Sequence, residues 1–202
     1  MIGAVYVVTD PEAPLPVAEQ ARAAARGGAW AVQLRDKRAA DAEMAQLATA
    51  LLAELAPLGV RVFVNDRVEV ARATGADLHI GQGDGDPRAA RGRIAPTALL
   101  GLSVETVAQC AAIPAGVSYI GAGPVRVTAT KPDAAAPVGI AGLARIAAAA
   151  PVPTIAIGGL AAADIPGLKS AGAAGLAVVS AVSRAADPEA ATRALVETWR
   201  RT

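Results

Sequence analysis

Eight short apolar segments recur along this chain of 202 residues, and alanine-rich segments that favour helices separate them. Near-continuous apolar strands alternating with helices indicate a parallel sheet that is buried on both faces. Eight such units in 202 residues favour a closed barrel, so we predict an α/β fold: a (β/α)8 TIM barrel in which residues 1–202 form a single domain. The expected strands are residues 4–8, 31–34, 60–64, 77–80, 99–104, 117–120, 154–157 and 176–179. The expected helices are residues 16–26, 39–56, 68–74, 104–112, 140–150, 161–171 and 188–200.

Polar residues or glycines directly follow seven of the eight apolar segments, and in the fifth unit Ser103 lies within the strand end. These strand ends read Thr9-Asp10, Arg35-Asp36-Lys37, Asn65-Asp66-Arg67, Gly81-Gln82-Gly83-Asp84, Gly121 to Lys131, Gly158-Gly159 and Ser180. The carboxyl ends of the strands build the active site in barrels of this kind. We therefore expect these residues to meet at one rim, which favours an enzyme.

The stretch from Gly121 to Lys131 combines two glycines, two threonines and a lysine directly after an apolar segment. Glycine permits tight turns and close approach to a ligand because it lacks a Cβ atom. Hydroxyl groups, backbone N–H groups and an ammonium suit the oxygens of a phosphate. The pattern predicts a site for an anionic substrate, with an ordinary surface loop as the alternative.

Strand alternation places Gln33, Arg35 and Lys37 on one face of the second strand end. Three hydrogen-bond donors on one face suit a diphosphate, although a solvated strand end also carries mixed charge. Gly158-Gly159 and Val179-Ser180 end the last two strands, where backbone N–H groups can form a phosphate cradle. The alternative for the glycine pair is a strand-to-helix turn.

Asp66 and Asp84 end neighbouring strands and are expected to lie close together. Paired carboxylates suit Mg²⁺, which keeps several waters and bridges the protein to substrate phosphates. The alternative is that these residues cap helices, with Asn65 or Asp66 before residue 68 and Asp84 or Asp86 before Pro87.

His79 and Cys110 are the only residues of their kinds, and neither pattern favours catalysis. His79 lies inside an expected strand without a partner at metal-ligand spacing, so we predict a core histidine whose polar atoms are satisfied. Cys110 lies in an expected helix without a neighbouring base, a pattern that does not favour a nucleophile. Trp30 and Trp199 are expected to be packing residues.

The composition of the chain argues against two classes of binding partner. A net charge of +1 and an aromatic content of 2% argue against nucleic acid, and the charge also argues against an anionic membrane. The longest uncharged stretches, residues 106–125 and 146–163, contain proline and glycine and are interpreted as successive helix, loop and strand. The start of the chain lacks the basic region of a signal peptide, so we expect a cytoplasmic protein. The sequence leaves its oligomeric state open.

Taken together, the motifs resemble those of the thiamine phosphate synthase family, in register from Tyr6 to Pro188. The segments that carry the resemblance are Gln33-Leu34-Arg35-Asp36-Lys37, Asn65-Asp66, Gly81-Gln82-Gly83-Asp84, Gly101-Leu102-Ser103, Gly121 to Lys131 with its Thr-x-Thr-Lys ending, Ile157-Gly158-Gly159 and Val179-Ser180-Ala181.

The resemblance implies a transferase that joins a hydroxymethylpyrimidine diphosphate to a thiazole phosphate and releases diphosphate. The implied binding residues for the pyrimidine diphosphate are Gln33, Leu34, Arg35, Asp36, Lys37, Asn65, Ser103 and Lys131. Those for the thiazole phosphate are Thr128, Ala129, Thr130, Gly159, Val179 and Ser180, and those for Mg²⁺ are Asp66 and Asp84. The catalytic candidates, which would stabilise or position the leaving group, are Arg35, Lys37, Ser103 and Lys131.

The chain departs from the family pattern at three places. Asp36 stands where many members have glutamate, and Gln82-Gly83-Asp84 replaces the more usual Gln-Glu-Asp. The segment between Asp66 and Asp84 is one residue shorter than usual, which would disturb the metal pair if it shifted the strand register.

Two other functions remain open at this point. A thiazole tautomerase on the same fold would keep the cradle at Gly159 and Ser180, but it has less use for the set of Asp66, Asp84 and Lys131. A non-catalytic barrel that binds a phosphate ligand would show binding without turnover and indifference to Mg²⁺.

Overall fold

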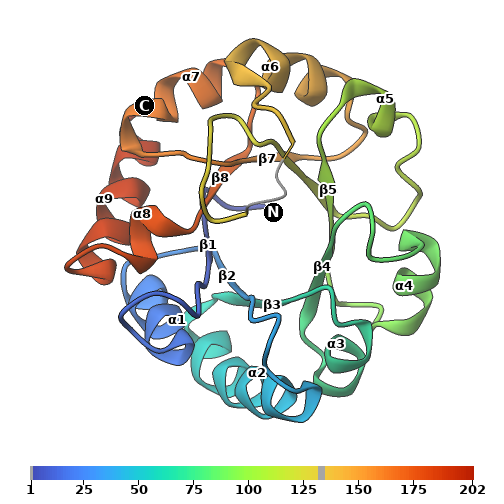
Figure 1. The fold of residues 1–202 in the computed structure, drawn as a ribbon, viewed down its shortest axis with the longest axis vertical. Helices are drawn as coiled ribbons and strands as arrows, with labels where there is room; N and C mark the ends of the chain where they lie inside the picture. Colours follow the sequence, from blue (N-terminus) through green and yellow to red (C-terminus); the bar gives the residue numbers. More distant parts are fainter. Residues whose placement is uncertain (1, 132–134) are drawn as a thin grey trace.

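A computed structural model describes residues 2–131 and 135–202, and its eight parallel strands form a closed barrel (Figure 1). Each strand pairs with the next along the chain, and β1 pairs with β8 to close the ring. The strands are β1 Val5–Val8, β2 Ala31–Leu34, β3 Arg61–Asn65, β4 Asp77–Ile80, β5 Leu100–Val104, β6 Tyr119–Ala122, β7 Thr154–Ile157 and β8 Gly175–Val178. The predicted (β/α)8 TIM barrel is therefore confirmed.

Helices surround the barrel on the outside (Figure 1). The α-helices are α1 Val17–Arg26, α2 Asp41–Leu55, α3 Val68–Thr74, α4 Pro87–Arg93, α5 Val107–Cys110, α6 Gly139–Ala149, α7 Ile165–Ser170, α8 Ser180–Ser183 and α9 Pro188–Arg201, and the 3₁₀ helices are η1 Ala56–Leu58 and η2 Ala162–Asp164. Within the part of the chain that the structure describes, no helix is long and apolar enough to cross a membrane.

Two helices were not predicted from the sequence, and one prediction was too long. The helix α4 has the sequence PRAARGR, which lacks an apolar stripe, and α8 is a single turn. The predicted helix at residues 104–112 is wrong at its start, because β5 continues to Val104 and the Thr106 hydroxyl caps α5 by accepting from the N–H of Gln109. Asp86 caps α4 by accepting from the N–H of Arg88.

The core has two layers. Between the sheet and the helices, aliphatic side chains such as Leu51, Leu143 and Ile146 are almost fully buried. Inside the barrel, Tyr6, Phe63 and Tyr119 pack against one another with ring centroids 5.1–6.0 Å apart, and Trp30 lies against all three. Four of the five aromatic residues of the chain thus fill the barrel interior.

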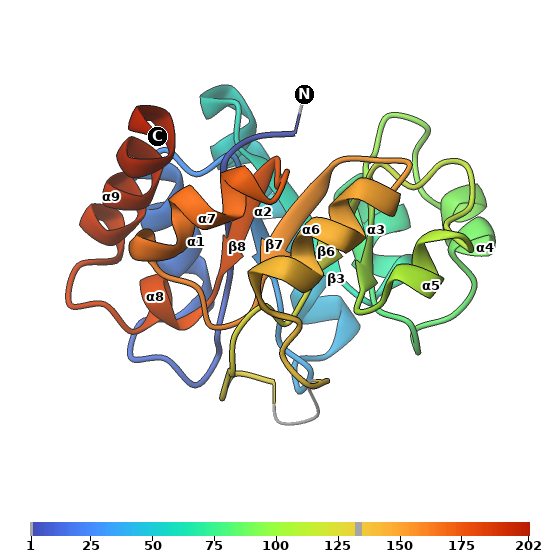
Figure 2. The same cartoon turned by 90° about the horizontal axis from the view of Figure 1, so that it is seen from above.

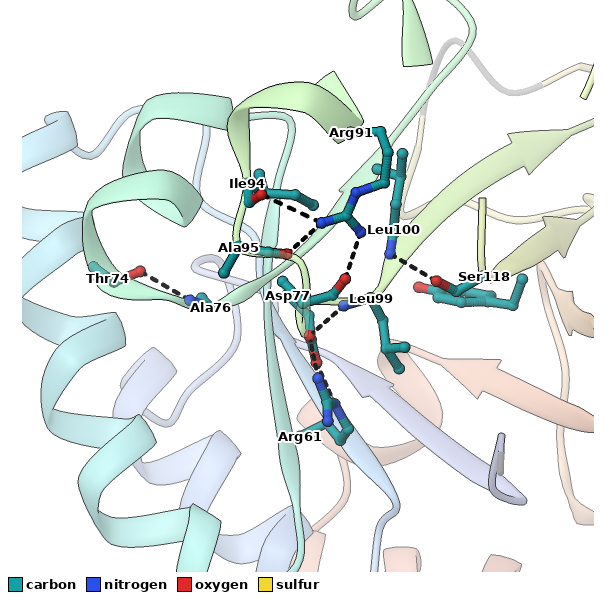
Figure 3. A network of polar contacts seen from close by, with 12 residues as sticks. Arg61, Thr74, Ala76, Asp77, Arg91, Ile94, Ala95, Leu99, Leu100 and Ser118 are labelled. Carbon is teal, nitrogen blue, oxygen red and sulfur yellow. Dashed lines mark hydrogen bonds and ion pairs between the residues drawn. The ribbon is translucent and has the colours of Figure 1, made fainter. Parts of the chain in front are cut away.

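A polar network connects β3, β4 and β5 at the amino-terminal end of the barrel (Figure 3). The buried carboxylate of Asp77 accepts hydrogen bonds from the guanidinium of Arg61 and from the N–H of Leu99, the latter at 2.7 Å. Arg91 donates to the carbonyl of Ala98 in the same loop region. This end of a barrel contributes to stability rather than to catalysis.

The loops at the opposite end build the candidate site. Figure 2 shows that the described part of the loop between β6 and α6 extends beyond the barrel at the lower side of the view, away from the C-terminus. Asn65 pairs with His79 in the β3–β4 register, and the N–H of Asp66 donates to the carbonyl of His79 at 2.9 Å. Asp66 therefore lies at the tip of β3, paired with the end of β4.

Candidate active site

A cavity of about 340 Å³ opens at the carboxyl ends of the strands, and every one of the eight strand–loop units contributes to its lining. The sequence-predicted residues that line it are Gln33, Arg35, Lys37, Asn65, Asp66, Asp84, Ser103, Thr128, Thr130, Lys131, Gly159, Val179 and Ser180. The structure thus brings residues from distant parts of the chain to one rim. Which of them contact a substrate stays a prediction.

The loop after β2 directs two cations into the cavity. Gln33, Arg35 and Lys37 all line it, as strand alternation predicts. The N–H of Arg35 donates to Oγ1 of Thr9 at 3.1 Å, and Arg67 donates to the backbone carbonyl of Asp36 at 2.7 Å. These two contacts hold the backbone of the loop at Arg35 and Asp36.

Leu34 and Asp36, also expected to bind the pyrimidine diphosphate, do not line the cavity, and their binding role stays a prediction. Leu34 is fully buried in the core outside the sheet. Oδ1 of Asp36 accepts from the backbone N–H groups of Arg38 at 2.8 Å and Ala39 at 3.2 Å, which shapes the loop. Both residues fall on the other face of the alternating chain.

The two aspartates predicted to bind metal line the same cavity, and neither caps a helix. Burial raises the pKa of the Asp66 carboxyl, and the negative charge of Asp84 raises it further. Asp66 has a left-handed backbone with φ of 53°, which is uncommon for a residue other than glycine. Oδ2 of Asp84 accepts from the N–H of Gly81 at 2.7 Å. Among the described residues, no group of three or more histidines, cysteines and carboxylates could hold a metal.

A chain of hydrogen bonds crosses the floor of the cavity. Nε2 of Gln33 donates to the hydroxyl of Tyr6 at 2.8 Å, and the hydroxyl of Tyr119 donates to the same oxygen at 3.2 Å. The hydroxyl of Tyr119 also lies 2.9 Å from Nδ1 of His79, and Nε2 of His79 lies 3.0 Å from Oγ of Ser103. We call these five residues the floor relay.

The proton positions in the floor relay depend on the tautomer of His79, and we infer them from the hydroxyl of Tyr119. In the inferred order, Tyr119 donates its only hydroxyl proton to Tyr6, so its oxygen accepts a hydrogen bond from Nδ1 of His79. Nε2 of His79 is then an acceptor for the hydroxyl proton of Ser103. This arrangement leaves the lone pairs of Ser103 free for a donor in the cavity.

The floor relay is uncharged. Burial lowers the pKa of His79 to about 4, so the imidazole is neutral at physiological pH. Burial also raises the pKa of both tyrosines. Gly101 makes room for the contact, because a Cβ atom there would lie 2.3 Å from the Tyr119 ring and 2.5 Å from Nδ1 of His79. The prediction that the polar atoms of His79 are satisfied is confirmed, but His79 also lines the cavity.

Glycines let the loops after β6 and β7 pack together. A Cβ atom on Gly123 would lie 2.1 Å from the carbonyl oxygen of Ile157. Gly159 has φ of 64°, and a Cβ atom there would lie 2.3 Å from the carbonyl oxygen of Val127. The N–H of Val125 donates to the carbonyl of Ile157 at 2.8 Å. The glycine-rich stretch is therefore fixed against the end of β7.

A second cavity, of about 270 Å³, adjoins the first on the side of these loops. Its lining residues are Val127, Thr128, Ala129, Thr130, Gly159, Ser180 and Arg184. Thr128, Thr130, Gly159 and Ser180 line both cavities. The hydroxyls of Thr128 and Thr130 are 2.9 Å apart, and so they present paired polar groups.

Charges of both signs line the main cavity. In the part of the chain that the structure describes, the cations are Arg35, Lys37 and Lys131, and the carboxylates are Asp66, Asp84 and Glu105. Nζ of Lys131 lies 4.0 Å from Oε1 of Glu105. A ligand that is both anionic and accompanied by a cation would be complementary to this arrangement.

Sequence reasoning missed Tyr6, Glu105, Tyr119 and Arg184 and underestimated His79. A polar atom inside an otherwise apolar strand was the available signal for Tyr6, His79 and Tyr119. Glu105 directly follows β5, as a residue at the rim should. No local signal marks Arg184, because its ion-pair partner Asp10 is 174 residues away.

Comparison with known proteins gives concordant matches. The family model described as "Thiamine monophosphate synthase" matches residues 5–182. The thiamine-phosphate synthase of Xanthobacter autotrophicus is 47% identical over 194 residues, which cover 94% of this chain and 92% of the relative. The thiamine-phosphate synthase of a Roseiflexus species is 45% identical over 197 residues, covering 96% and 84%.

Solved structures match over nearly the whole chain. A thiamine phosphate pyrophosphorylase from Pyrococcus furiosus superimposes with a TM-score of 0.88 and 32% identity, covering 98% of this chain and 96% of the other. A 3-hexulose-6-phosphate synthase superimposes with a TM-score of 0.70 and 22% identity over 96% and 99%. The second likeness concerns the fold alone.

Proposed function

The chain belongs to the thiamine monophosphate synthase family, and we propose that its two cavities bind the two substrates of that activity side by side. Its function is that of a thiamine-phosphate synthase, a transferase of thiamine biosynthesis. The substrates are 4-amino-2-methyl-5-(diphosphooxymethyl)pyrimidine and 4-methyl-5-(2-phosphooxyethyl)thiazole, and the products are thiamine phosphate and diphosphate. The observation that carries the proposal is that the residues expected for both substrates line adjoining cavities.

The pyrimidine diphosphate occupies the main cavity. Its ring lies toward the uncharged floor relay, where Gln33 and Ser103 offer polar atoms, and Asn65 adds an amide at the rim. Its diphosphate lies toward Arg35, Lys37 and Lys131, which are the cations of the described lining. Guanidinium and ammonium groups are strong donors to phosphate oxygens. Leu34 contributes to binding through its backbone, and Asp36 contributes by shaping the loop that carries Arg35 and Lys37.

The thiazole phosphate places its phosphate in the second cavity. Five of the six residues implied for it, namely Thr128, Ala129, Thr130, Gly159 and Ser180, line that cavity, and Val179 lines the main cavity beside it. Threonine and serine hydroxyls and the exposed backbone at glycine are suitable donors to phosphate oxygens. Because four residues line both cavities, a thiazole whose phosphate sits in the second cavity projects its ring into the first.

Asp66 and Asp84 are suited to hold Mg²⁺. The pKa of Asp66 is raised by burial and by the charge of Asp84, and a divalent cation would relieve both effects. Two carboxylates are few for a structural metal site, but Mg²⁺ commonly keeps waters and completes its shell with substrate phosphate oxygens. When bound there, Mg²⁺ would supply positive charge to the oxygens of the diphosphate.

The chain's own residues fit a dissociative reaction. The bond between the pyrimidine methylene carbon and the diphosphate oxygen breaks, both electrons leave with diphosphate, and the thiazole nitrogen donates its electron pair to the resulting carbocation. Arg35, Lys37 and Lys131 stabilise the charge that develops on the departing diphosphate. Removal of one such donor costs about 3 kcal/mol, or roughly a hundredfold in rate, in comparable sites.

Neither a nucleophile nor a general acid is required from the protein. Cys110 is buried, burial raises its pKa, and it lies outside the lining of both cavities. His79 is neutral and both its ring nitrogens are engaged, so its role is to position Ser103. Holding the two substrates in line contributes the remaining rate enhancement by proximity.

One assay tests the proposal. Both substrates are mixed with the protein, with and without Mg²⁺, and diphosphate and thiamine phosphate are measured together. We expect equimolar formation of both products that depends on Mg²⁺. Isomerisation of a thiazole phosphate without use of the pyrimidine would instead indicate a tautomerase. Binding without any product, unaffected by Mg²⁺, would indicate a non-catalytic phosphate-binding barrel.

A further inference from the structure

Arg184 lies at the second cavity, outside the set of residues that the sequence pointed to. It directly follows the single turn of α8, and its backbone N–H donates to the carbonyl of Ser180 at 3.2 Å. Residues four apart in a helical turn lie on the same face. Arg184 and Ser180 therefore reach the same cavity, which both line.

Arg184 supplies the charge that this cavity otherwise lacks. Among the described residues that line the second cavity, it is the only one with a charged side chain. The hydroxyls of Thr128, Thr130 and Ser180 can donate hydrogen bonds, but they do not balance the charge of a phosphate monoester, which is close to −2 at neutral pH. A guanidinium matches phosphate oxygens in both charge and shape.

Asp10 holds the guanidinium in place from one side. Nη2 and Nε of Arg184 lie 3.0 and 3.3 Å from the same carboxylate oxygen of Asp10. Asp10 is itself fixed at the end of β1, because its N–H donates to Gln20 at 2.9 Å and its carbonyl accepts from Gln20 at 2.7 Å. Its other carboxylate oxygen accepts from the N–H of Glu12 at 2.9 Å.

The ion pair leaves part of the guanidinium available. Nη1 of Arg184 makes no hydrogen bond to any residue in 2–131 or 135–202, and the side chain is 54% exposed. Asp10, by contrast, is only 12% exposed in its side chain. The pair thus consists of a fixed carboxylate that orients a cation whose remaining N–H groups are free.

We propose that Arg184 binds the phosphate of the thiazole substrate and selects the phosphorylated thiazole over the free alcohol, with Asp10 as its positioning residue. The inference rests on the proposed function, because it assigns a further residue to the same subsite. The hydroxyls of Thr128, Thr130 and Ser180 orient the phosphate oxygens, and Arg184 neutralises their charge.

Calorimetric titration tests this by comparing two ligands: 4-methyl-5-(2-phosphooxyethyl)thiazole and 4-methyl-5-(2-hydroxyethyl)thiazole. For Arg184→Ala we expect the Kd of the phosphate to rise about tenfold, the lower end for a charge-assisted hydrogen bond because the side chain is half-exposed. The Kd of the alcohol should change less than about twofold. In steady-state kinetics, KM for the thiazole phosphate should rise by a similar factor while KM for the pyrimidine diphosphate stays within about twofold.

Two further variants control the comparison. Arg193→Ala removes another half-exposed arginine that is ion-paired, here with Glu189 on α9, and it lines neither cavity. It should leave both Kd values unchanged. Arg184→Lys keeps the charge and should fall between the wild type and Arg184→Ala.

The inference is overturned if Arg184→Ala, folded by circular dichroism, binds the phosphate as tightly as the wild type. Equal weakening of phosphate and alcohol would also overturn it, since that result means lost packing rather than lost phosphate recognition. Failure of the proposed function looks different: the wild type itself would form no thiamine phosphate and would not prefer the phosphate over the alcohol.

Discussion

Tyr119→Phe removes one buried oxygen from the centre of the floor relay and leaves the ring in place. The side chain is fully buried and packs edge-on against Phe63 at a centroid distance of 5.6 Å, contacts that phenylalanine can keep. In the inferred proton order, the lost hydroxyl accepts from Nδ1 of His79 and donates to Tyr6. The variant therefore isolates the polar function of Tyr119.

The expected loss of stability follows from the groups left without partners. The hydroxyl of Tyr6 still accepts from Gln33 at 2.8 Å, so it loses only one of two contacts. Nδ1 of His79 loses its partner in a half-buried site, and an unsatisfied polar group costs about 1–3 kcal/mol when it is buried. We expect the free energy of unfolding to fall by about 2 kcal/mol, measured by denaturant titration.

The same variant should move a proton. Without the Tyr119 oxygen, the favourable position for the imidazole proton is Nε2, where Oγ of Ser103 can accept it from 3.0 Å. Ser103 then turns its own proton toward the cavity and loses its role as an acceptor there. We expect kcat/KM for the pyrimidine diphosphate to fall about tenfold, the effect of one hydrogen bond.

Nitrogen-15 NMR can read the tautomer directly, because His79 is the only histidine in the chain. We expect the Nδ1–H tautomer in the wild type and the Nε2–H tautomer in Tyr119→Phe. Tyr6→Phe tests the same order from the other side, since it removes the acceptor of the Tyr119 hydroxyl and should release Tyr119 to donate to Nδ1 of His79. An unchanged tautomer in Tyr119→Phe, together with a stability loss below about 0.5 kcal/mol, would refute the proton order derived for the relay.

Three other predictions concern the rim and the opposite end of the barrel. Lys131→Ala should lower kcat about a hundredfold without changing the unfolding midpoint, because the ammonium is half-exposed and acts on the leaving diphosphate; near-normal turnover would remove Lys131 from the site. Because the pKa of Asp66 is raised, protons should compete with Mg²⁺ for this carboxylate at a pH above the usual aspartate range. The Mg²⁺ concentration that gives half-maximal activity should therefore rise as the pH falls through the pKa of Asp66. Asp66→Asn should abolish this dependence of the Mg²⁺ requirement on pH. It should also stabilise the metal-free protein at neutral pH, because the charged carboxylate destabilises the fold above the raised pKa and no longer does so below it. Asp77→Ala should lower the free energy of unfolding by about 2–4 kcal/mol and leave kcat/KM unchanged. The loss is less than for a fully buried pair because Arg61 is 38% exposed. A loss of activity without a loss of stability would contradict the assignment of stability to the amino-terminal end of the barrel and of catalysis to the other end.

The barrel itself could be predicted because its signals are local. The boundaries of β2, β4 and β7 agree with the expected residues 31–34, 77–80 and 154–157, where apolar runs end abruptly at polar residues or glycine. The rim residues followed from one rule, that strand ends of a parallel barrel converge. Strand alternation also predicts that Leu34 and Asp36 face away from the cavity, because it places Gln33, Arg35 and Lys37 on one face and the residues between them on the other.

The floor relay and Arg184 could not be predicted, because each depends on contacts between distant segments. Tyr6 and Tyr119 are 113 residues apart, and they meet only because the barrel closes and Gly101 leaves space beside them. Arg184 meets Asp10 only where α8 follows the strand that pairs with β1. Periodicity in the sequence indicates which face a residue occupies, but it does not indicate which residue across the barrel will be its partner.

The cavity has an uncharged floor and a charged rim, and this difference suits the two fragments of the proposed reaction. Breaking the bond between carbon and diphosphate separates charge, and the two fragments are stabilised by different surroundings. The rim offers Arg35, Lys37 and Lys131 to the anion, whereas the floor has a neutral His79 and aromatic rings that can face a delocalised cation. If the imidazole were protonated at neutral pH, its charge would oppose the carbocation from below. A neutral His79 therefore suits the proposed reaction, and a substitution that raised the pKa of His79 should slow turnover even where both substrates still bind.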